Sequence, residues 1–182
     1  LRILDNKNIN KNLQTLGISS NLFEILTQAL KLTQGLILIS GPTGSGKTTT
    51  LYSILQELNC EEKKIITVED PIEYKIDSIC QIPINNKIGL SFELVLRNIL
   101  RQDPDIIFIG EIRDKFSLDI ALQASLTGHL VIASIHANNA VETILRLIDL
   151  QADPFLISST LKLVMAQRLV LNYCTFCNSQ GC

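Results

Sequence analysis

Residues 41–48 read Gly41-Pro42-Thr43-Gly44-Ser45-Gly46-Lys47-Thr48. The apolar run Leu36-Ile37-Leu38-Ile39 directly precedes this stretch, and a segment with apolar residues at 51, 54, 55 and 58 follows it. A strand, a glycine-rich loop and an amphipathic helix, in that order, are the context in which Gly-x4-Gly-Lys-Thr forms a phosphate-binding loop. The stretch therefore predicts nucleotide binding between a strand and a helix.

Each residue type in this loop has a physical role in holding a triphosphate. Glycines let the backbone wrap a phosphate with its N–H groups, and the helix N-terminus adds positive potential. We expect Lys47 to reach the β- and γ-phosphates and the Thr48 hydroxyl to ligate Mg²⁺, so ATP and Mg²⁺ are the predicted ligands. The predicted nucleotide contacts from this segment are Gly41, Pro42, Thr43, Gly44, Ser45, Gly46, Lys47, Thr48 and Thr49.

Short apolar runs recur along the chain, with segments of helical periodicity between them. Runs of this length are typical of buried parallel strands. The alternation predicts an α/β fold: a doubly wound, mostly parallel sheet flanked by helices. The candidate strands are 36–39, 65–68, 106–109 and 130–135, and the candidate helices include 20–33 and two within 138–170 that separate near Asp153-Pro154.

Composition limits the class of protein. The 182 residues are 46% hydrophobic, which suits one globular domain, and no apolar run approaches the ~20 residues that a membrane span needs. Sixteen basic against eighteen acidic residues, with no basic run, disfavour a nucleic-acid partner. We expect 1–20 to be the end of a preceding domain and a linker, 21–172 to be the nucleotide-binding domain, and 173–182 to begin a truncated cysteine module.

Two acidic clusters follow candidate strands. Residues 69–74 read Glu-Asp-Pro-Ile-Glu-Tyr, and residues 110–114 read Gly-Glu-Ile-Arg-Asp. An enzyme with a phosphate-binding loop needs carboxylates at the carboxyl ends of neighbouring strands, where they position Mg²⁺ and activate the attacking water. Both clusters are therefore expected at the sheet edge that carries the loop.

Glu111 is the first candidate for activating water, because it stands at a strand tip where Gly110 replaces the more usual Asp. Glu69 also lies beside an apolar strand, where an unpaired carboxylate is poorly tolerated, so a functional role is favoured for it as well. Together with Glu73 and Lys47, these residues form the predicted catalytic set.

Asp70 is the candidate Mg²⁺ ligand of the first cluster, directly or through water. The sequence does not rank Asp70, Glu69 and Glu73 against one another. In the alternative interpretation Asp70-Pro71 is a turn and Glu73 a solvated charge. For Asp114, a helix cap before Phe116 is the favoured interpretation.

The two histidines bracket one candidate strand. Ligands in open α/β sheets bind at the carboxyl ends of strands, so His136 is expected to sense the γ-phosphate and His129 to be structural. Arg113 is a further candidate nucleotide contact. Arg97 and Arg101 are alternatives that could act within the subunit or across an oligomer interface, or form weak surface pairs, and the choice stays open.

Several segments, in order along the chain, resemble the motifs of the secretion ATPases of type II secretion and type IV pilus assembly. The absence of Asp at position 110 is itself part of that family's pattern. The resembling segments are 41–48 (Walker A), 67–74 (Asp box), 105–114 (Walker B) and 127–139 (His box), with Leu1-Arg2-Ile3-Leu4-Asp5 and Ala166-Gln167-Arg168-Leu169 towards the ends.

The resemblance implies a RecA-like fold and a homohexamer at the cytoplasmic face of the inner membrane. It also implies ATP-driven work on an inner-membrane platform protein, which powers the assembly of a pilus or pseudopilus in secretion, pilus biogenesis or DNA uptake. The alternatives are a pilus-retraction or type IV secretion ATPase and, more remotely, a RecA-like nucleic-acid translocase.

Cys174, Cys177 and Cys182 form a cluster at the end of the sequence. The C-x2-C spacing suits zinc, although a structural Zn²⁺ usually has four ligands and this cluster supplies three. Assembly and secretion members of the resembled family share a four-cysteine zinc module at this position, whereas retraction members lack it. The cluster therefore favours assembly over retraction, with three incidental cysteines as the alternative.

Overall fold

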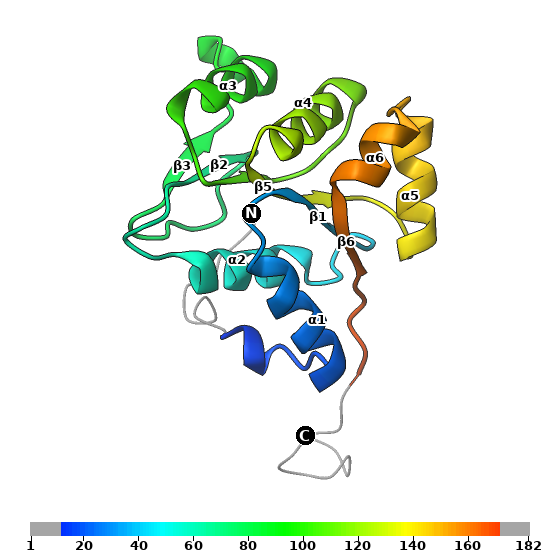
Figure 1. Ribbon diagram of the computed structural model, residues 1–182. Coiled ribbons are helices and arrows are strands. Elements are labelled where there is room, and N and C mark those ends of the chain that lie inside the picture. The colour runs from blue at the N-terminus through cyan, green and yellow to red at the C-terminus, as the bar shows by residue number, and fades with distance from the viewer. Residues whose placement is uncertain (1–11, 172–182) are drawn as a thin grey trace.

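The computed structural model describes residues 12–171, which are organised around one six-stranded sheet (Figure 1). Its strand order is β3-β2-β4-β5-β1-β6, and every neighbouring pair is parallel. The predicted doubly wound α/β fold is confirmed. The strands are β1 (Gly35–Ser40), β2 (Ile65–Glu69), β3 (Cys80–Pro83), β4 (Ile106–Ile109), β5 (Leu130–Ile135) and β6 (Leu161–Ala166).

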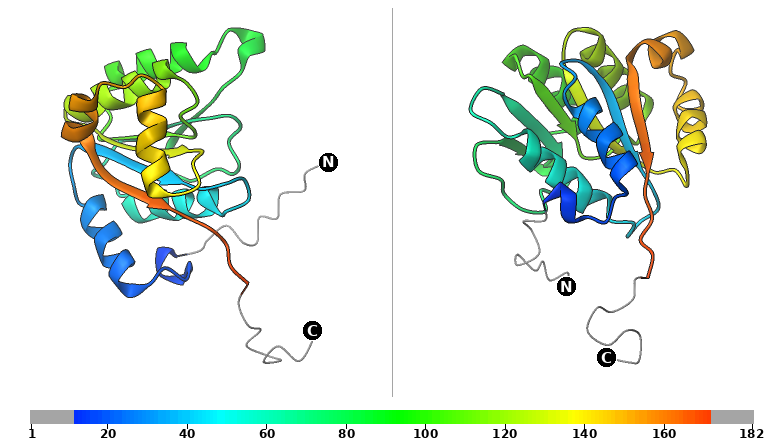
Figure 2. Two further views of the ribbon diagram at one scale, coloured as in Figure 1. Left: turned by 90° about the vertical axis from the view of Figure 1, so that its right-hand side faces the viewer. Right: turned by 60° about the horizontal axis from the view of Figure 1, so that its bottom comes forward.

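Helices cover both faces of this sheet (Figure 2). In Figure 1, α3 and α4 lie above the sheet, α1 and α2 lie below it, and α5 and α6 stand beside the β6 edge. The helices are α1 (Ser20–Leu30), α2 (Lys47–Leu58), α3 (Phe92–Ile99), α4 (Lys115–Leu126), α5 (Ala140–Asp149) and α6 (Pro154–Thr160), with short 3-10 turns at Leu13–Thr15, Asn86–Ile88 and Leu100–Gln102.

The core is divided in two by the sheet. Every residue of β1, β2, β4 and β5 is buried, which explains why these strands read as unbroken apolar runs. Alternate side chains of β1 enter opposite cores: Leu36 and Leu38 pack towards α3 and α4, and Ile37 and Ile39 pack towards α1 and α2. Leu13 also packs in the second core, so the packed body extends N-terminally at least to that residue.

The sheet topology brings the sequence motifs to one edge. β5 pairs with β1 on one side and with β4 on the other, and β2 pairs with β4. Because all these strands are parallel, the segments that follow β1, β2, β4 and β5 leave the sheet at the same edge. The four predicted motif segments contain or adjoin those strand ends.

The first helix and two strands differ from the sequence-based expectations. α1 ends at Leu30 and not at residue 33, and Gly35 opens β1. β3 was not expected, because Cys80-Gln81-Ile82-Pro83 is short, half polar and contains proline. These are features of an edge strand with little burial.

The expectation of helix through to residue 170 was wrong. α6 ends at Thr160, and the next residue begins β6, which pairs with β1. Ile157, Leu161 and Val164 follow i, i+4, i+7 spacing, so apolar periodicity alone favours a continued helix. Backbone pairing along the open edge of β1 decides the conformation instead.

Exposed apolar side chains gather on α5 and α6. We call these residues the α5–α6 patch, and they are Val141, Ile144, Leu145, Ile148 and Phe155, with exposed fractions of 41% to 72%. No helix within residues 12–171 is long and apolar enough to cross a membrane.

Candidate nucleotide-binding and hydrolysis site

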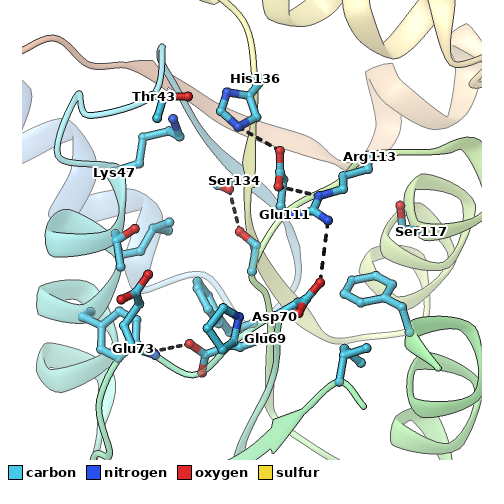
Figure 3. Close-up of a pocket in the computed structure, with 18 of the residues that line it drawn as sticks. Thr43, Lys47, Glu69, Asp70, Glu73, Glu111, Arg113, Ser117, Ser134 and His136 are labelled. Atoms are coloured by element: carbon cyan, nitrogen blue, oxygen red, sulfur yellow. Dashed lines mark hydrogen bonds and ion pairs between the residues drawn. The ribbon is translucent and has the colours of Figure 1, made fainter. Parts of the chain in front are cut away.

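A cavity of about 710 Å³ opens at the sheet edge where β1, β2, β4 and β5 end. The loop before α2 forms one wall, and the segments after β2 and β4 form the opposite wall (Figure 3). Carboxylates, an arginine, a histidine and a lysine face the same space. The predicted convergence of the motif segments is therefore present in the fold.

The loop between β1 and α2 is shaped to hold phosphates. α2 begins at Lys47, directly after Gly46, which adopts a left-handed conformation with φ of 86°. The first-turn N–H groups of a helix and its positive end face such a loop. The Ser45 hydroxyl is buried and finds no hydrogen-bond partner within residues 12–171.

Lys47 is held by hydrogen bonds to its own loop. Its Nζ donates to the carbonyl oxygens of Gly41 (2.6 Å) and Pro42 (2.9 Å). Burial lowers the pKa of Lys47 below its ordinary value, and the charge of Glu111 opposes that shift. A phosphate would therefore find a lysine whose ammonium is already aimed along the loop and partly stripped of water.

Glu111 is clamped between two basic groups, as Figure 3 shows. His136 Nε2 lies 2.9 Å from Oε1, and Arg113 Nε donates to Oε2 at 2.6 Å. The hydrogen bond to Glu111 is the main cause that raises the pKa of Arg113, so this guanidinium stays charged. Only 21% of the Glu111 side chain is exposed, which fixes the carboxylate at the cavity wall.

The backbone that carries Glu111 is fixed by β2 and β5. The Gly110 N–H donates to Val68 O (2.8 Å), and the Ser134 hydroxyl donates to Gly110 O (2.5 Å). A Cβ atom at position 110 would lie 3.1 Å from Val68 O, a tight contact. Close approach of β2 therefore explains why glycine suits a position where an acid is more usual.

Glu69 has a different environment from Glu111. Its side chain is buried, with 3% exposed, and both carboxylate oxygens have partners. Oε2 accepts a short hydrogen bond from the Tyr52 hydroxyl, and Oε1 accepts from Thr67 Oγ1 (2.7 Å) and Gln81 Nε2 (3.2 Å). These bonds tie Glu69 to α2, β2 and β3, and its predicted catalytic role stays a prediction.

Asp70, Glu73 and Thr48 supply the oxygen atoms that could hold Mg²⁺. All three line the cavity, and Asp70 lies 3.7 Å from an Arg113 nitrogen. Carboxylates and hydroxyls opposite a phosphate loop are the hard ligands that Mg²⁺ prefers. Glu73 is half-buried, and its backbone N–H donates to the Tyr52 hydroxyl (3.2 Å). The donor set fits a magnesium ion carried by a nucleotide.

Most of the predicted site residues meet at this cavity. Gly41 and Pro42 lie behind the lining and contact Lys47 through their carbonyl groups. The predicted residues that line the cavity are Thr43, Gly44, Ser45, Gly46, Lys47, Thr48, Thr49, Glu69, Asp70, Glu73, Glu111, Arg113 and His136.

The structure also places residues for which the sequence left more than one interpretation open. Asp114 caps α4 with a reciprocal bond to Ser117, which confirms the helix-cap interpretation. His129 bonds Ala124 O (3.1 Å) in the turn before β5, away from the cavity. Arg97 pairs with Glu93 on the surface of α3, so Arg113 is the arginine that the fold brings to this cavity.

Sequence reasoning missed Tyr52 and Ser134. Tyr52 lies off the apolar stripe of α2 yet is 1% exposed, and its hydroxyl joins Glu69 to the Glu73 backbone. The available signal was a single aromatic residue with a polar hydroxyl, one turn after the phosphate-binding loop. Its partners could be predicted only if β2 were known to lie beside α2.

The cysteine cluster at 174, 177 and 182 lies outside the described residues. Within residues 12–171 there is no group of three His, Cys, Asp or Glu side chains with the geometry of a metal site. The zinc expectation therefore stays a prediction.

Comparisons with known proteins agree with this geometry. The profile of the family described as "Type II/IV secretion system protein" matches residues 1–181. "Type II secretion system protein HxcR" of Pseudomonas aeruginosa is 49% identical over 177 residues, which cover 97% of this chain and 38% of that protein. "Type II secretion system ATPase E" of Vibrio cholerae is 50% identical over 177 residues, covering 97% of this chain and 35% of that protein. The chain thus spans little more than a third of these relatives.

Solved structures match over the same region. The Legionella pneumophila ATPase DotB superposes with a TM-score of 0.76 at 32% identity, over 88% of this chain and 47% of that one. The pilus retraction motor PilT, solved with bound ADP, gives a TM-score of 0.74 at 37% identity, over 88% of this chain and 48% of that one. The fold is therefore of the RecA-like type found in secretion ATPases, and the chain belongs to the type II/IV secretion system protein family.

Proposed function

We propose that this chain is an ATP-hydrolysing motor domain that powers pilus or pseudopilus assembly. One observation carries the proposal: Lys47, Glu111 and His136 converge on a single cavity at the carboxyl edge of a parallel sheet. This arrangement offers a cation for the phosphates, a clamped carboxylate for water and a group able to respond to the γ-phosphate. Relatives named as secretion ATPases and a PilT structure with ADP support the same conclusion.

Binding begins at the loop between β1 and α2. The β- and γ-phosphates accept from loop N–H groups, and Lys47 exchanges its two carbonyl partners for phosphate oxygens. Mg²⁺, held on the protein side by Thr48 and Asp70, would neutralise phosphate charge. Residues 41–49 thus bind and orient the nucleotide.

Hydrolysis requires a water molecule in line with the γ-phosphorus. As the water oxygen bonds to phosphorus and the bond to the β–γ bridging oxygen breaks, Glu111 takes up the proton that the water releases. Arg113 keeps the carboxylate in place during this step. Before it, the γ-phosphate of bound ATP can draw His136 away from its contact with Glu111, which makes this histidine the γ-phosphate sensor.

The mechanical partners follow from the family. We propose a homohexamer in the cytoplasm, associated peripherally with the inner membrane, that works on an inner-membrane platform protein. The C-x2-C pair with Cys182 favours assembly over retraction if it contributes to a Zn²⁺ module. A nucleic-acid translocase is the second candidate by fold, and the net charge of −2 weighs against it.

The test is an ATPase assay of the full-length protein that contains this chain. The assay is run under three conditions: with the full-length protein alone, with the cytoplasmic domain of the candidate platform protein added, and with single-stranded DNA added. We expect stimulation by the platform domain and none by DNA, and Lys47→Ala should remove ATP binding in a nucleotide titration. Stimulation by DNA alone would establish a nucleic-acid translocase, and micromolar ATP affinity in Lys47→Ala would refute the site.

A further inference from the structure

Gln167, directly after β6, packs against the start of the phosphate-binding loop. β6 runs parallel to β1 with Ala166 opposite Ser40, and the Gln167 N–H continues the pairing by donating to Ser40 O (2.8 Å). Figure 1 shows β6 beside β1 at the sheet edge. The backbone of Gln167 therefore lies where the chain leaves β1 for the loop.

The side chain of Gln167 reaches the helix on the other side of the loop. Its Oε1 accepts from Thr50 Oγ1 at 2.8 Å, a bond between residues 117 positions apart. Thr50 is 1% exposed, and its own N–H donates to Gly46 O (3.1 Å). One residue thus bonds both to the strand before the loop and to the helix after it.

Two glycines of the loop lie directly on Gln167. A Cβ atom at Gly41 would fall 2.4 Å from Gln167 O, and one at Gly46 would fall 2.9 Å from Gln167 Nε2. The loop backbone is therefore in contact with Gln167 at both of its ends. Contacts of this kind fix a loop in one shape before its ligand arrives.

We propose that Gln167 is a positioning residue that holds the phosphate-binding loop in its nucleotide-receiving conformation through Ser40 and Thr50. The inference rests on the proposed function of that loop. Gln167 lies outside the cavity lining, so it acts on the nucleotide through the loop and not by direct contact. The role is independent of which machine the protein drives.

The experiment measures ATP affinity by nucleotide titration of the full-length protein, with Gln167→Leu, Thr50→Val and the double variant. Each single variant loses the hydrogen bond between the two side chains, and we expect ATP affinity to fall about 10-fold in each. Because both changes remove the same bond, the ATP affinity of the double variant should be no lower than that of whichever single variant binds ATP less tightly. Thr50→Ser keeps the hydroxyl and should retain most of the affinity.

Thr143→Val is the matched control. Thr143 is a buried helical threonine of α5 whose hydroxyl bonds Asn139 O (2.9 Å), far from the loop in sequence. The Thr143→Val change should lower the unfolding midpoint about as much as Thr50→Val does, while the ATP affinity stays unchanged. This comparison separates a general loss of stability from a loss of loop geometry.

Either of two results would overturn the inference while the wild type binds ATP. One is unchanged affinity in folded Gln167→Leu and Thr50→Val, and the other is fully additive losses in the double variant. If Gln167→Leu fails to fold, the comparison of Thr50→Val with Thr50→Ser decides. Failure of the proposed function has a separate signature, because the wild type itself would then not bind ATP.

Discussion

At the scale of single residues, the cavity gives two predicted catalytic carboxylates different environments. Both oxygens of Glu69 accept hydrogen bonds, from Tyr52, Thr67 and Gln81. Glu111 faces the cavity and is held by side chains that also line it. The residue types and their places at strand ends were predictable from the sequence, but their hydrogen-bond partners on β3 and α2 were not, because those partners come from segments distant in the sequence.

Glu111→Gln should bind ATP normally and lower kcat by about 10²- to 10⁴-fold, because an amide cannot take up the proton of the attacking water. The measurement is kcat together with nucleotide affinity in the full-length protein. Glu57→Gln, at an exposed position of α2, is the matched control and should be silent. A wild-type kcat in Glu111→Gln would transfer the water-activating role to Glu73.

At the scale of elements, the site depends on how α2 and β2 are joined. The Tyr52 hydroxyl donates to Glu69 at the end of β2 and accepts from the Glu73 N–H. The first residues of α2 are the predicted phosphate contacts, so this one hydroxyl joins the predicted phosphate side of the cavity to its acidic side. β1, β2, β4 and β5 were predictable from apolar runs, whereas β3 and β6 depend on edge pairing that local periodicity does not report.

Tyr52→Phe should destabilise the protein by about 1–3 kcal/mol, because it leaves a buried Glu69 oxygen and the Glu73 N–H each without this partner. It should also lower kcat more than it lowers ATP affinity, since the acidic loop is displaced and the phosphate loop is not. Urea unfolding and steady-state kinetics provide the measurements. Tyr74→Phe is the matched control, because the Tyr74 ring lies 4.0 Å from the Tyr52 ring between centroids, at a tilt of 44°, and the change keeps the Tyr52–Glu69 bond. It should have the smaller effect. Equal effects of the two variants would contradict the role of the Tyr52 hydroxyl in joining α2 to β2.

At the scale of the whole molecule, large apolar side chains of α5 and α6 stay exposed. The α5–α6 patch places five large apolar side chains in solvent at the β6 side of the sheet. Exposed apolar side chains on neighbouring helices can promote self-association at high concentration. The sequence shows α5 as an amphipathic helix, but only packing reveals which of its apolar residues stay outside.

Leu145→Lys and Leu147→Lys test this assignment within one helix. Leu145 is 55% exposed and Leu147 is 0% exposed. We expect Leu145→Lys to keep its unfolding midpoint and raise the concentration at which this chain stays in solution, whereas Leu147→Lys buries an unpaired charge and should unfold it. Thermal unfolding and light scattering would record both effects, and similar behaviour of the two variants would show that the helix face is misassigned.

The pairing of β6 with β1 also bears on the order in which the protein is made. A ribosome releases β1 and its phosphate loop well before β6, and the bond between Thr50 and Gln167 joins residues 117 positions apart. Until the later strand arrives, β1 presents an unpaired edge, which is a template for incorrect pairing with other chains. Because long-range pairing is slow, the segment at 41–48 gains its contacts with Gln167 only after β6 has been made, and chaperones would have their greatest effect in that interval.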